Sequence, residues 1–350
     1  MLLLVGGYTV RMDEDTPGKA RGVSAYDFSP ASGQLEYRGF GKAENPSYIL
    51  SDPQRKTVYA VKECLNAYDP GLNAFRLSRI AGGKIAFEAL GEVPLDGDHP
   101  CHLAYAERTL IVSCYTSGSV HVFSLDEDGR IGKPIQRIKL EQREREPHAH
   151  CALYDSKRSR VYVCDLGSDC LRIFERDGGG MLTELPDFSI NFAAGDGPRH
   201  IDMHPDGEHL LLNCEHRGRV AMISLYEDRP REIVNVPSLP ERAVEGASGA
   251  ALRLGSGGRD LYISERNYSV ITALRVDTKR PDLQLRDTIP SGGLRPRDII
   301  LSPDGKWLIS ANLKDHSLGV FRRGPGGGLV LNHVVRKVPS PTSLCWMPGI

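Results

Sequence analysis

Short apolar runs separated by turn residues dominate the chain, and several of these runs alternate apolar and polar positions. Residues 201–203 are followed by a His-Pro-Asp-Gly turn at 204–207 and then by the apolar run 210–214. Proline presets φ, aspartate tolerates the turn and glycine supplies positive φ, so this stretch predicts a β-hairpin. Antiparallel pairing places the start of the first strand beside the end of the second. We therefore expect Arg199 and Glu215 at the same edge of a sheet.

The same hairpin pattern recurs along the chain at intervals of about 50 residues, which is typical of the blades of a β-propeller. The clearest copy spans 297–312 and contains a Ser-Pro-Asp-Gly turn. Weaker copies begin near residues 48, 102, 148 and 248, and most copies are followed by a third apolar run.

The two ends of the chain supply one more blade, from residues 2–5, 23–28 and 342–346. We therefore predict an all-β, seven-bladed β-propeller with four antiparallel strands per blade. It forms a single domain over residues 1–350, with the ring closed by the N- and C-terminal strands in one blade. Closure removes the exposed edges that an open sheet has to protect.

Composition excludes several classes of partner. The net charge of −1 does not favour binding to nucleic acid or an anionic membrane. No apolar run approaches the roughly 18 residues of a spanning helix. The eight cysteines include no CxxC pair, which favours buried thiols in a reducing compartment. We expect a cytoplasmic protein, monomeric or weakly dimeric, without a nucleic-acid or membrane partner.

The polar residues 11–22 form either a loop over the ring opening or an inert surface loop.

In a propeller, the starts of the first strands and the ends of the second strands face the same mouth. Arginines, carboxylates and histidines gather at these positions, which suits an anionic ligand and a general base. The strand starts contribute His102, His148, Arg199, His200, Ser248 and Arg297, and the strand ends contribute Glu63, Asp165, Glu215, Arg266 and Asn312.

The run Pro-His-Ala-His at 147–150 has three interpretations. His148 could act as a general base near neutral pH. The two imidazoles could bind a metal ion with Glu215 or Asp165 as a third ligand. His150 could instead be a structural residue inside a blade. We predict a catalytic role for His148 and a structural one for His150.

The arginines also have alternatives. Arg199 and Arg266 could be structural ion-pair partners of Glu215 and Asp165, or they could converge to bind an anionic group and stabilise an oxyanion. Arg297 holds a blade junction or contacts substrate, and Asp165 either stabilises a turn or faces the substrate. We assign catalysis to His148, Glu215 and Arg199. We assign substrate binding to Arg266, His102, His200, Arg297 and Asp165. No glycine-flanked elbow indicates a serine nucleophile.

Several motifs, in their order and spacing, resemble the seven-bladed lactonase family. This family includes propeller-type 6-phosphogluconolactonases and 3-carboxy-cis,cis-muconate lactonising enzymes. The matching motifs are Gly7-Tyr8-Thr9, Asn45-Pro46-Ser47-Tyr48, Pro147-His148-Ala149-His150, Asp165-Leu166-Gly167-Ser168-Asp169, Gly197-Pro198-Arg199-His200, Asn213-Cys214-Glu215 and Ser302-Pro303-Asp304-Gly305.

The resemblance implies a catalytic histidine at His148, site residues at Arg199 and Glu215, and a further arginine at Arg266. The chain departs from the family pattern at 264–266, where Ser-Glu-Arg replaces Ser-Asn-Arg, and at 113–115, where Ser-Cys-Tyr replaces Ala-Asn-Tyr. The ligand pattern of the metal-dependent six-bladed gluconolactonases is not found, so no metal or cofactor is expected.

The resulting hypothesis is hydrolysis of a sugar lactone, most simply an anionic one such as 6-phosphogluconolactone. His148 would deprotonate water, and the arginines would bind the oxyanion or the anionic group. Glu215 would orient His148 or an arginine, or share the role of base. Loss of the His148 side chain should then abolish most turnover. The alternatives are a lactonising cycloisomerase acting on a carboxymuconate, and a binding scaffold with a degenerate site.

Overall fold

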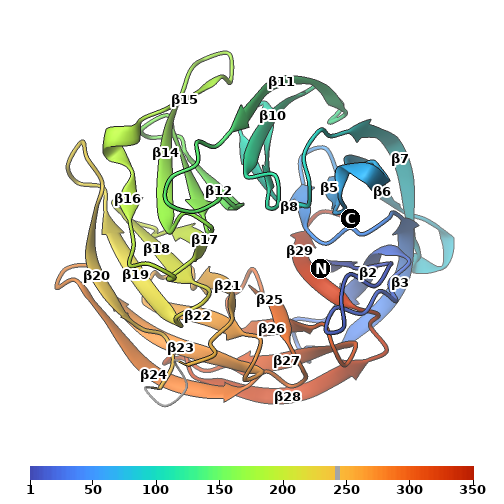
Figure 1. Ribbon diagram of the computed structural model, residues 1–350. Coiled ribbons are helices and arrows are strands. Elements are labelled where there is room, and N and C mark those ends of the chain that lie inside the picture. The colour runs from blue at the N-terminus through green and yellow to red at the C-terminus, as the bar shows by residue number, and fades with distance from the viewer. Residues whose placement is uncertain (241–244) are drawn as a thin grey trace.

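The computed structural model describes residues 1–240 and 245–350, which form seven β-sheets arranged as a ring around a central channel (Figure 1). Each sheet is a blade whose strands run antiparallel from the channel to the rim. The predicted all-β, seven-bladed propeller is therefore confirmed. Among the described residues, no helix is long and apolar enough to cross a membrane.

The strands of each blade follow one another from the channel outward. Blade 1 contains β29 (Pro341–Met347), β1 (Leu2–Gly7), β2 (Gly22–Phe28) and β3 (Leu35–Lys42), with β29 innermost. Blade 2 contains β4 (Ile49–Asp52), β5 (Thr57–Lys62), β6 (Gly71–Arg79) and β7 (Ile85–Pro94). Blade 3 contains β8 (Pro100–Ala106), β9 (Thr109–Cys114), β10 (Ser119–Leu125) and β11 (Ile131–Lys139).

Blade 4 contains β12 (Ala149–Asp155), β13 (Arg160–Asp165), β14 (Cys170–Arg176) and β15 (Leu182–Glu184). Blade 5 contains β17 (Pro198–Met203), β18 (His209–Cys214), β19 (Arg219–Ser224) and β20 (Arg231–Pro237). Blade 6 contains β21 (Gly249–Leu254), β22 (Asp260–Glu265), β23 (Val270–Asp277) and β24 (Asp282–Pro290). Blade 7 contains β25 (Pro296–Leu301), β26 (Trp307–Asn312), β27 (Ser317–Arg323) and β28 (Leu329–Arg336).

Blade 4 departs from the four-strand pattern at its outer edge. A fifth strand, β16 (Ile190–Asn191), pairs with β14 beside β15, so two short strands share the edge that one longer strand covers in the other blades. Three short 3-10 helices lie in connections: η1 (Asn66–Tyr68), η2 (Ala81–Gly83) and η3 (Pro186–Phe188).

The ring closes through the two ends of the chain, as predicted. The C-terminal β29 pairs antiparallel with the N-terminal β1, in a register that joins Leu2 to Met347 and Leu4 to Cys345 (Figure 1). Because β29 is the innermost strand of blade 1, this blade is complete only when residues 341–347 pair with β1.

The hydrophobic core is divided among the seven interfaces between adjacent blades. In β18, Leu210 and Leu212 pack toward blade 4, whereas Leu211 packs toward blade 6. Successive side chains of a strand point to opposite faces, so a strand between two neighbours is apolar at consecutive positions. This explains the uninterrupted apolar runs in the sequence.

Candidate active site

The same backbone hydrogen bond recurs in every blade at one mouth of the channel. The residue immediately after the second strand donates its N–H to a carbonyl at the entry to the first strand. We call this donor the post-strand position and the carbonyl residue the entry position. The seven pairs are Tyr8 to Ser340, Glu63 to Asn45, Tyr115 to His99, Leu166 to His148, Glu215 to Gly197, Arg266 to Ser248 and Leu313 to Arg295.

Two residues beyond each entry position lies a residue that we call the inner position. In several blades the strand register shifts here, so that this residue is a β-bulge skipped by the pairing. Bulges re-aim side chains and are common beside active sites. The inner positions are Thr342, Ser47, Cys101, His150, Arg199, Ala250 and Arg297.

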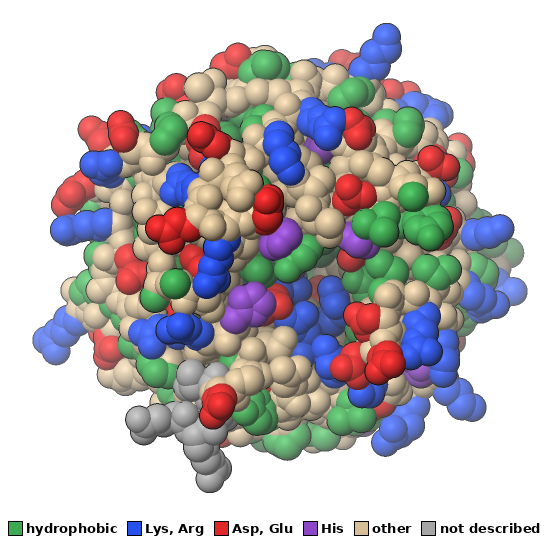
Figure 2. All heavy atoms as spheres, in the orientation of Figure 1, with side chains coloured by type: hydrophobic (Ala, Val, Ile, Leu, Met, Phe, Trp, Pro, Cys, Tyr) green, Lys and Arg blue, Asp and Glu red, His purple; other side chains and the backbone are tan. Residues whose placement is uncertain are grey.

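A cavity of about 330 Å³ opens at this mouth, in the hollow where Figure 2 shows basic, acidic and histidine side chains around the centre. Residues from both repeat positions line it: Cys101, His150, Arg199 and Arg297 from the inner positions, and Tyr8, Glu63, Tyr115, Glu215 and Arg266 from the post-strand positions.

Glu215 holds two of the three arginines in this cavity. Its Oε2 atom accepts a hydrogen bond from Nε of Arg199 at 2.8 Å, and its Oε1 atom lies 2.7 Å from Nη2 of Arg266. Burial opposes ionisation of Glu215, but the two guanidinium groups outweigh it and lower the pKa of the carboxyl to about 2. Glu215 is therefore an ionised anchor at neutral pH.

Arg297 has a different environment. Within the described part of the chain, no carboxylate oxygen forms an ion pair with its guanidinium group, which lies 5.3 Å from the centre of the Tyr8 ring. The Tyr8 hydroxyl donates to Glu63, with oxygen–oxygen distances of 3.0 and 3.1 Å. Glu63 is thus hydrogen-bonded by tyrosine rather than paired directly with Arg297. Burial disfavours the charge of Arg297, but Tyr8 and the nearby carboxylates of Glu63 and Glu215 outweigh this and raise its pKa.

The two histidines of the Pro-His-Ala-His run occupy different places. His150, at the inner position, lines the cavity, and its Nδ1 atom is buried without a hydrogen-bond partner in the described structure. Burial, followed by the charge of Arg199, holds the pKa of His150 well below its ordinary value. His150 is therefore neutral at neutral pH.

His148 lies at the entry position and does not line the cavity. Its ring stacks on Tyr115 with centroids 4.5 Å apart and an interplanar angle of 9°. Its Nδ1 atom is 3.0 Å from the carbonyl oxygen of Tyr115. In the structure His148 therefore packs against Tyr115 and supports it. His150, which was expected to be structural, lines the cavity.

His102 and His200 lie one residue beyond the inner positions and point deeper into the channel. His200 borders a small cavity of about 20 Å³ below the main one, together with His150 and Arg199. His102 packs 4.3 Å from Tyr48, and its Nε2 atom is 3.3 Å from Sγ of Cys151. Neither borders the main cavity, so the predicted substrate contacts of His102 and His200 are not seen there.

Asp165 requires a correction. It was predicted to bind substrate, but it is fully buried away from the cavity. One carboxylate oxygen accepts from Nε of Arg172 at 2.8 Å and the other accepts from the backbone N–H of His148 at 2.8 Å. Asp165 is the last residue of its strand, one place before the post-strand position. Because side chains alternate along a strand, it faces the opposite side from Glu215 and fixes the loop of His148.

The loop between β1 and β2 covers part of the cavity, which favours the first of the two interpretations of residues 11–22. Met12, Asp13 and Thr16 line the cavity wall. Asp15 ties the loop to blade 7 through Arg295 at 3.1 Å and Lys314 at 2.7 Å.

Tyr8, Cys101 and Tyr115 also line the cavity, although no role was predicted for them from the sequence. Their positions in the repeat were available from the sequence: Tyr8 and Tyr115 follow second strands, as Glu215 does, and Cys101 stands where Arg199 stands. Aligning the blades residue by residue would have found all three.

A larger groove of about 640 Å³ lies between blades 1 and 2 and includes Arg21, Phe40 and Lys62. Two of its cations are already engaged: Arg21 lies over the Phe40 ring, and Lys62 is near Glu44 and Glu92. The central cavity is the better candidate because buried titratable groups from five blades converge on it.

Comparison with known proteins agrees with the fold. The family model described as lactonase, seven-bladed β-propeller, matches residues 2–346. The 6-phosphogluconolactonase of Bacillus subtilis is 26% identical over 337 residues, covering 93% of this chain and 94% of that protein. The 6-phosphogluconolactonase of Formosa agariphila is 24% identical over 334 residues, covering 92% of each chain.

Among solved structures, the periplasmic gluconolactonase of Pseudomonas aeruginosa superposes with a TM-score of 0.89 at 24% identity, covering 99% of this chain and 100% of that one. This likeness concerns the fold. Since that gluconolactonase is periplasmic, the cytoplasmic location expected for the present chain stays a prediction.

Proposed function

Because the chain belongs to the seven-bladed β-propeller lactonase family, we propose that it hydrolyses an anionic sugar lactone, with 6-phosphogluconolactone as the first candidate. The names of the relatives from Bacillus subtilis and Formosa agariphila support this substrate class. A cavity of about 330 Å³ lies within the usual range for small-molecule sites, roughly 300–1,000 Å³.

The observation that carries the proposal is the arrangement of three arginines on the cavity wall, beside the carboxylates of Asp13, Glu63 and Glu215. Arg199 and Arg266 share Glu215, whereas Arg297 has no carboxylate partner among the described residues. A guanidinium group offers paired donors that match a phosphate or carboxylate. Arg297, which forms no direct ion pair within the described part of the chain, would therefore receive the anionic group of the substrate.

His150 is the proposed general base. A neutral imidazole at the cavity wall can take a proton from water as the water oxygen attacks the lactone carbonyl. The carbonyl becomes an oxyanion, which then collapses with cleavage of the bond to the ring oxygen. The proton held by His150 passes to that oxygen and completes the hydroxy acid. A bound anion beside Arg297 would also offset the positive field that depresses the basicity of His150.

Arg199 and Arg266 would stabilise the oxyanion. Both guanidinium groups are held in place by Glu215 and by backbone carbonyls; Arg199, for example, donates to the Ala250 carbonyl at 2.7 Å. They therefore need no rearrangement during the reaction. Loss of one such donor typically costs about 3 kcal/mol of transition-state stabilisation. In this proposal Glu215 is a positioning residue, because its charge is fully used by the two arginines.

The experiment compares the decay of fresh 6-phosphogluconolactone with that of unphosphorylated gluconolactone, with and without the protein. These lactones also hydrolyse unaided, so each rate is referred to buffer. His150→Ala should lower the enzymatic rate by about 10²–10⁴-fold, the usual contribution of a general base.

His148→Ala is the matched control, two residues away on the same strand entry. It should keep turnover within about tenfold, because it disturbs only the support of Tyr115. The reverse pattern would restore His148 as the base. No acceleration of either lactone, together with turnover of a carboxymuconate, would replace hydrolysis by the cycloisomerase reaction.

A further inference from the structure

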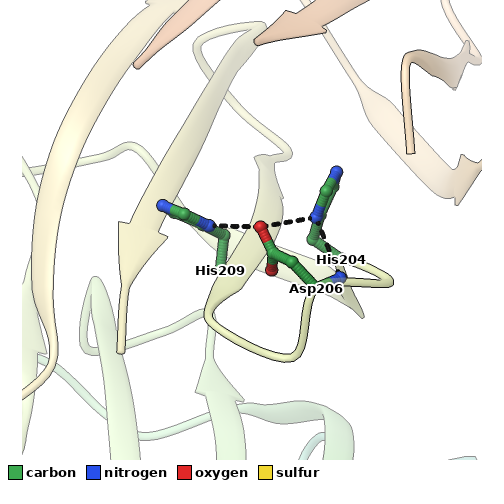
Figure 3. A group of neighbouring side chains, drawn as sticks. All are labelled: His204, Asp206 and His209. Carbon is green, nitrogen blue, oxygen red and sulfur yellow. Dashed lines mark hydrogen bonds and ion pairs between the residues drawn. The ribbon is translucent and has the colours of Figure 1, made fainter. Parts of the chain in front are cut away.

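Two histidines and an aspartate converge at the end of blade 5 opposite to the cavity, on the turn between β17 and β18 (Figure 3). One ligand atom from each of His204, Asp206 and His209 lies within 4.8 Å of the other two. The Oδ2 atom of Asp206 is 2.9 Å from Nδ1 of His204 and 2.9 Å from Nδ1 of His209. The predicted His-Pro-Asp-Gly turn and the first residue of β18 thus bring together three side chains of the types that bind metal ions.

The hydrogen bonds of His204 leave a lone pair, not a proton, on its Nδ1 atom. Nε2 lies 3.2 Å from the carbonyl oxygen of Gly258, which can only accept, so the ring proton belongs on Nε2. The backbone N–H of Asp206 donates to Nδ1 over 3.2 Å, which requires a lone pair there. The Nδ1 atom of His204 faces the carboxylate of Asp206 across 2.9 Å. A cation placed beside these two atoms could be bound by both.

Gly258 acts as an orienting group for His204. It lies in the turn between β21 and β22 of blade 6, and a carbonyl that accepts from the far nitrogen is the usual second partner of a metal-binding imidazole. Its φ is +71°, and a Cβ atom at this position would lie 2.3 Å from Nε2 of His204. Only glycine allows this approach.

The other two side chains are also held in place. His209 is 2% exposed, with its ring packed edge-on against Tyr226 at a centroid distance of 5.2 Å. Asp206 is 28% exposed and leaves one side of the cluster open to solvent. A buried and a partly buried imidazole beside an exposed carboxylate leave one side open for water as a further ligand.

We propose that His204, Asp206 and His209 bind a divalent transition-metal ion of the zinc class, with water completing its coordination. Two imidazoles and one carboxylate suit such ions, whereas Ca²⁺ and Mg²⁺ prefer oxygen ligands alone. With bonds of about 2.0–2.2 Å, the ligand atoms of a tetrahedral zinc site are roughly 3.4 Å apart. The 2.9 Å contacts reach that spacing by a small rotation of the side chains. Through Gly258, the ion would tie the turns of blades 5 and 6 together, away from the cavity.

The test uses the full-length protein after treatment with a chelator and dialysis. Titration with ZnCl2, followed by calorimetry and by elemental analysis of the dialysed protein, should give one ion per chain and a higher melting temperature. Replacing zinc by Co²⁺ should produce the visible absorption of a cobalt site with nitrogen ligands. The double variant His204→Gln/His209→Gln should lose the stoichiometric ion, the melting shift and the cobalt absorption.

Two further variants separate this site from other ligands in the chain. Gly258→Ala should weaken zinc binding by about 10–100-fold, as expected for loss of a second partner of a metal-binding histidine. His333→Gln, on blade 7, should bind zinc as the unaltered protein does. Stoichiometric zinc that persists in the double variant, or no stoichiometric zinc in the unaltered protein, would overturn the proposal.

Discussion

At the scale of single residues, one place along a strand decides whether a charged side chain lines the cavity or supports the scaffold. Glu215 and Asp165 belong to equivalent hairpins, yet only Glu215 follows its strand and faces the cavity. His150 and His148 differ in the same way, because the bulge turns only the first of them inward. Residue type alone therefore does not identify the site.

Arg297 provides the residue-scale prediction. Arg297→Gln should raise KM for 6-phosphogluconolactone by about 10–100-fold, since a charged hydrogen bond contributes roughly 1.5–3 kcal/mol. The unphosphorylated lactone, which has no anionic group to lose, should change little. Steady-state kinetics on both substrates checks this expectation.

Arg295→Gln is the matched control for that experiment, because Arg295 lies two residues earlier and pairs with Asp15 instead. An equal loss on the phosphorylated and unphosphorylated lactones would contradict the assignment of Arg297 to the anionic group.

At the scale of elements, the innermost strands carry histidines into a channel already occupied by arginines. His102, His150 and His200 come from β8, β12 and β17, and their rings pack against one another along the channel. Burial, followed by nearby arginines, lowers the pKa of His102 to about 3 and lowers the pKa values of His150 and His200 well below the ordinary range. These three imidazoles are therefore neutral in the folded protein at neutral pH.

Stability should therefore fall as the pH drops below about 6.5, where histidine in the unfolded chain takes up a proton. The folded channel does not take up these protons, so each histidine reduces the free energy of unfolding by up to about 1.4 kcal/mol per pH unit. Three of them together predict a slope of up to about 4 kcal/mol per unit. Urea unfolding between pH 7.5 and 5 measures this slope.

The double variant His102→Gln/His200→Gln should show a shallower dependence on pH, whatever its stability at pH 7.5. His99→Gln, on the cavity rim, should leave the slope close to that of the unaltered protein. If the free energy of unfolding changes with pH equally in the unaltered protein, the double variant and His99→Gln, the channel histidines are protonated in the folded state.

At the scale of the whole molecule, the ring depends on contacts between residues at the two ends of the sequence. Leu344 of β29 packs in the core between blades 1 and 7, and Cys345 and Met347 pack in the core between blades 1 and 2. One strand therefore completes two of the seven blade interfaces and covers the inner edge of β1.

Removal of residues 339–350 should abolish cooperative unfolding, because β1 is left with an open edge and two interfaces lose their innermost packing. Removal of residues 349–350 alone leaves β29 intact and should lower the melting temperature only slightly. Circular dichroism during heating distinguishes the two outcomes. A cooperative transition in the longer deletion would show that six blades and an incomplete seventh form a stable ring.

Much of the architecture could be predicted because repetition and apolar runs are local properties of the chain. Turns such as 204–207 and 302–305 predicted their hairpins through the dihedral preferences of proline, aspartate and glycine. The terminal runs near Leu4 and Leu344 predicted the closing blade because together they supply one more copy of the repeat.

Convergence of arginines and acids at one mouth was also predictable from the order of strands, since antiparallel pairing places strand starts and ends together. The burial of Asp165, the stacking of His148 on Tyr115 and the approach of the 11–22 loop were not. Each depends on a side-chain direction or a contact between distant blades, which periodicity does not encode.

The amino-acid order was thus sufficient for the class of fold, the number of blades, their closure and the chemical character of the mouth, because these follow from hydrophobic periodicity and turn chemistry. The folded ring decides which histidine reaches the cavity and how the 204–209 segment meets Gly258. It also decides which arginine lacks a direct ion pair among residues 1–240 and 245–350. A β-bulge shifts a strand by one residue, and this shift becomes visible only when the neighbouring strand shows which residue it skips.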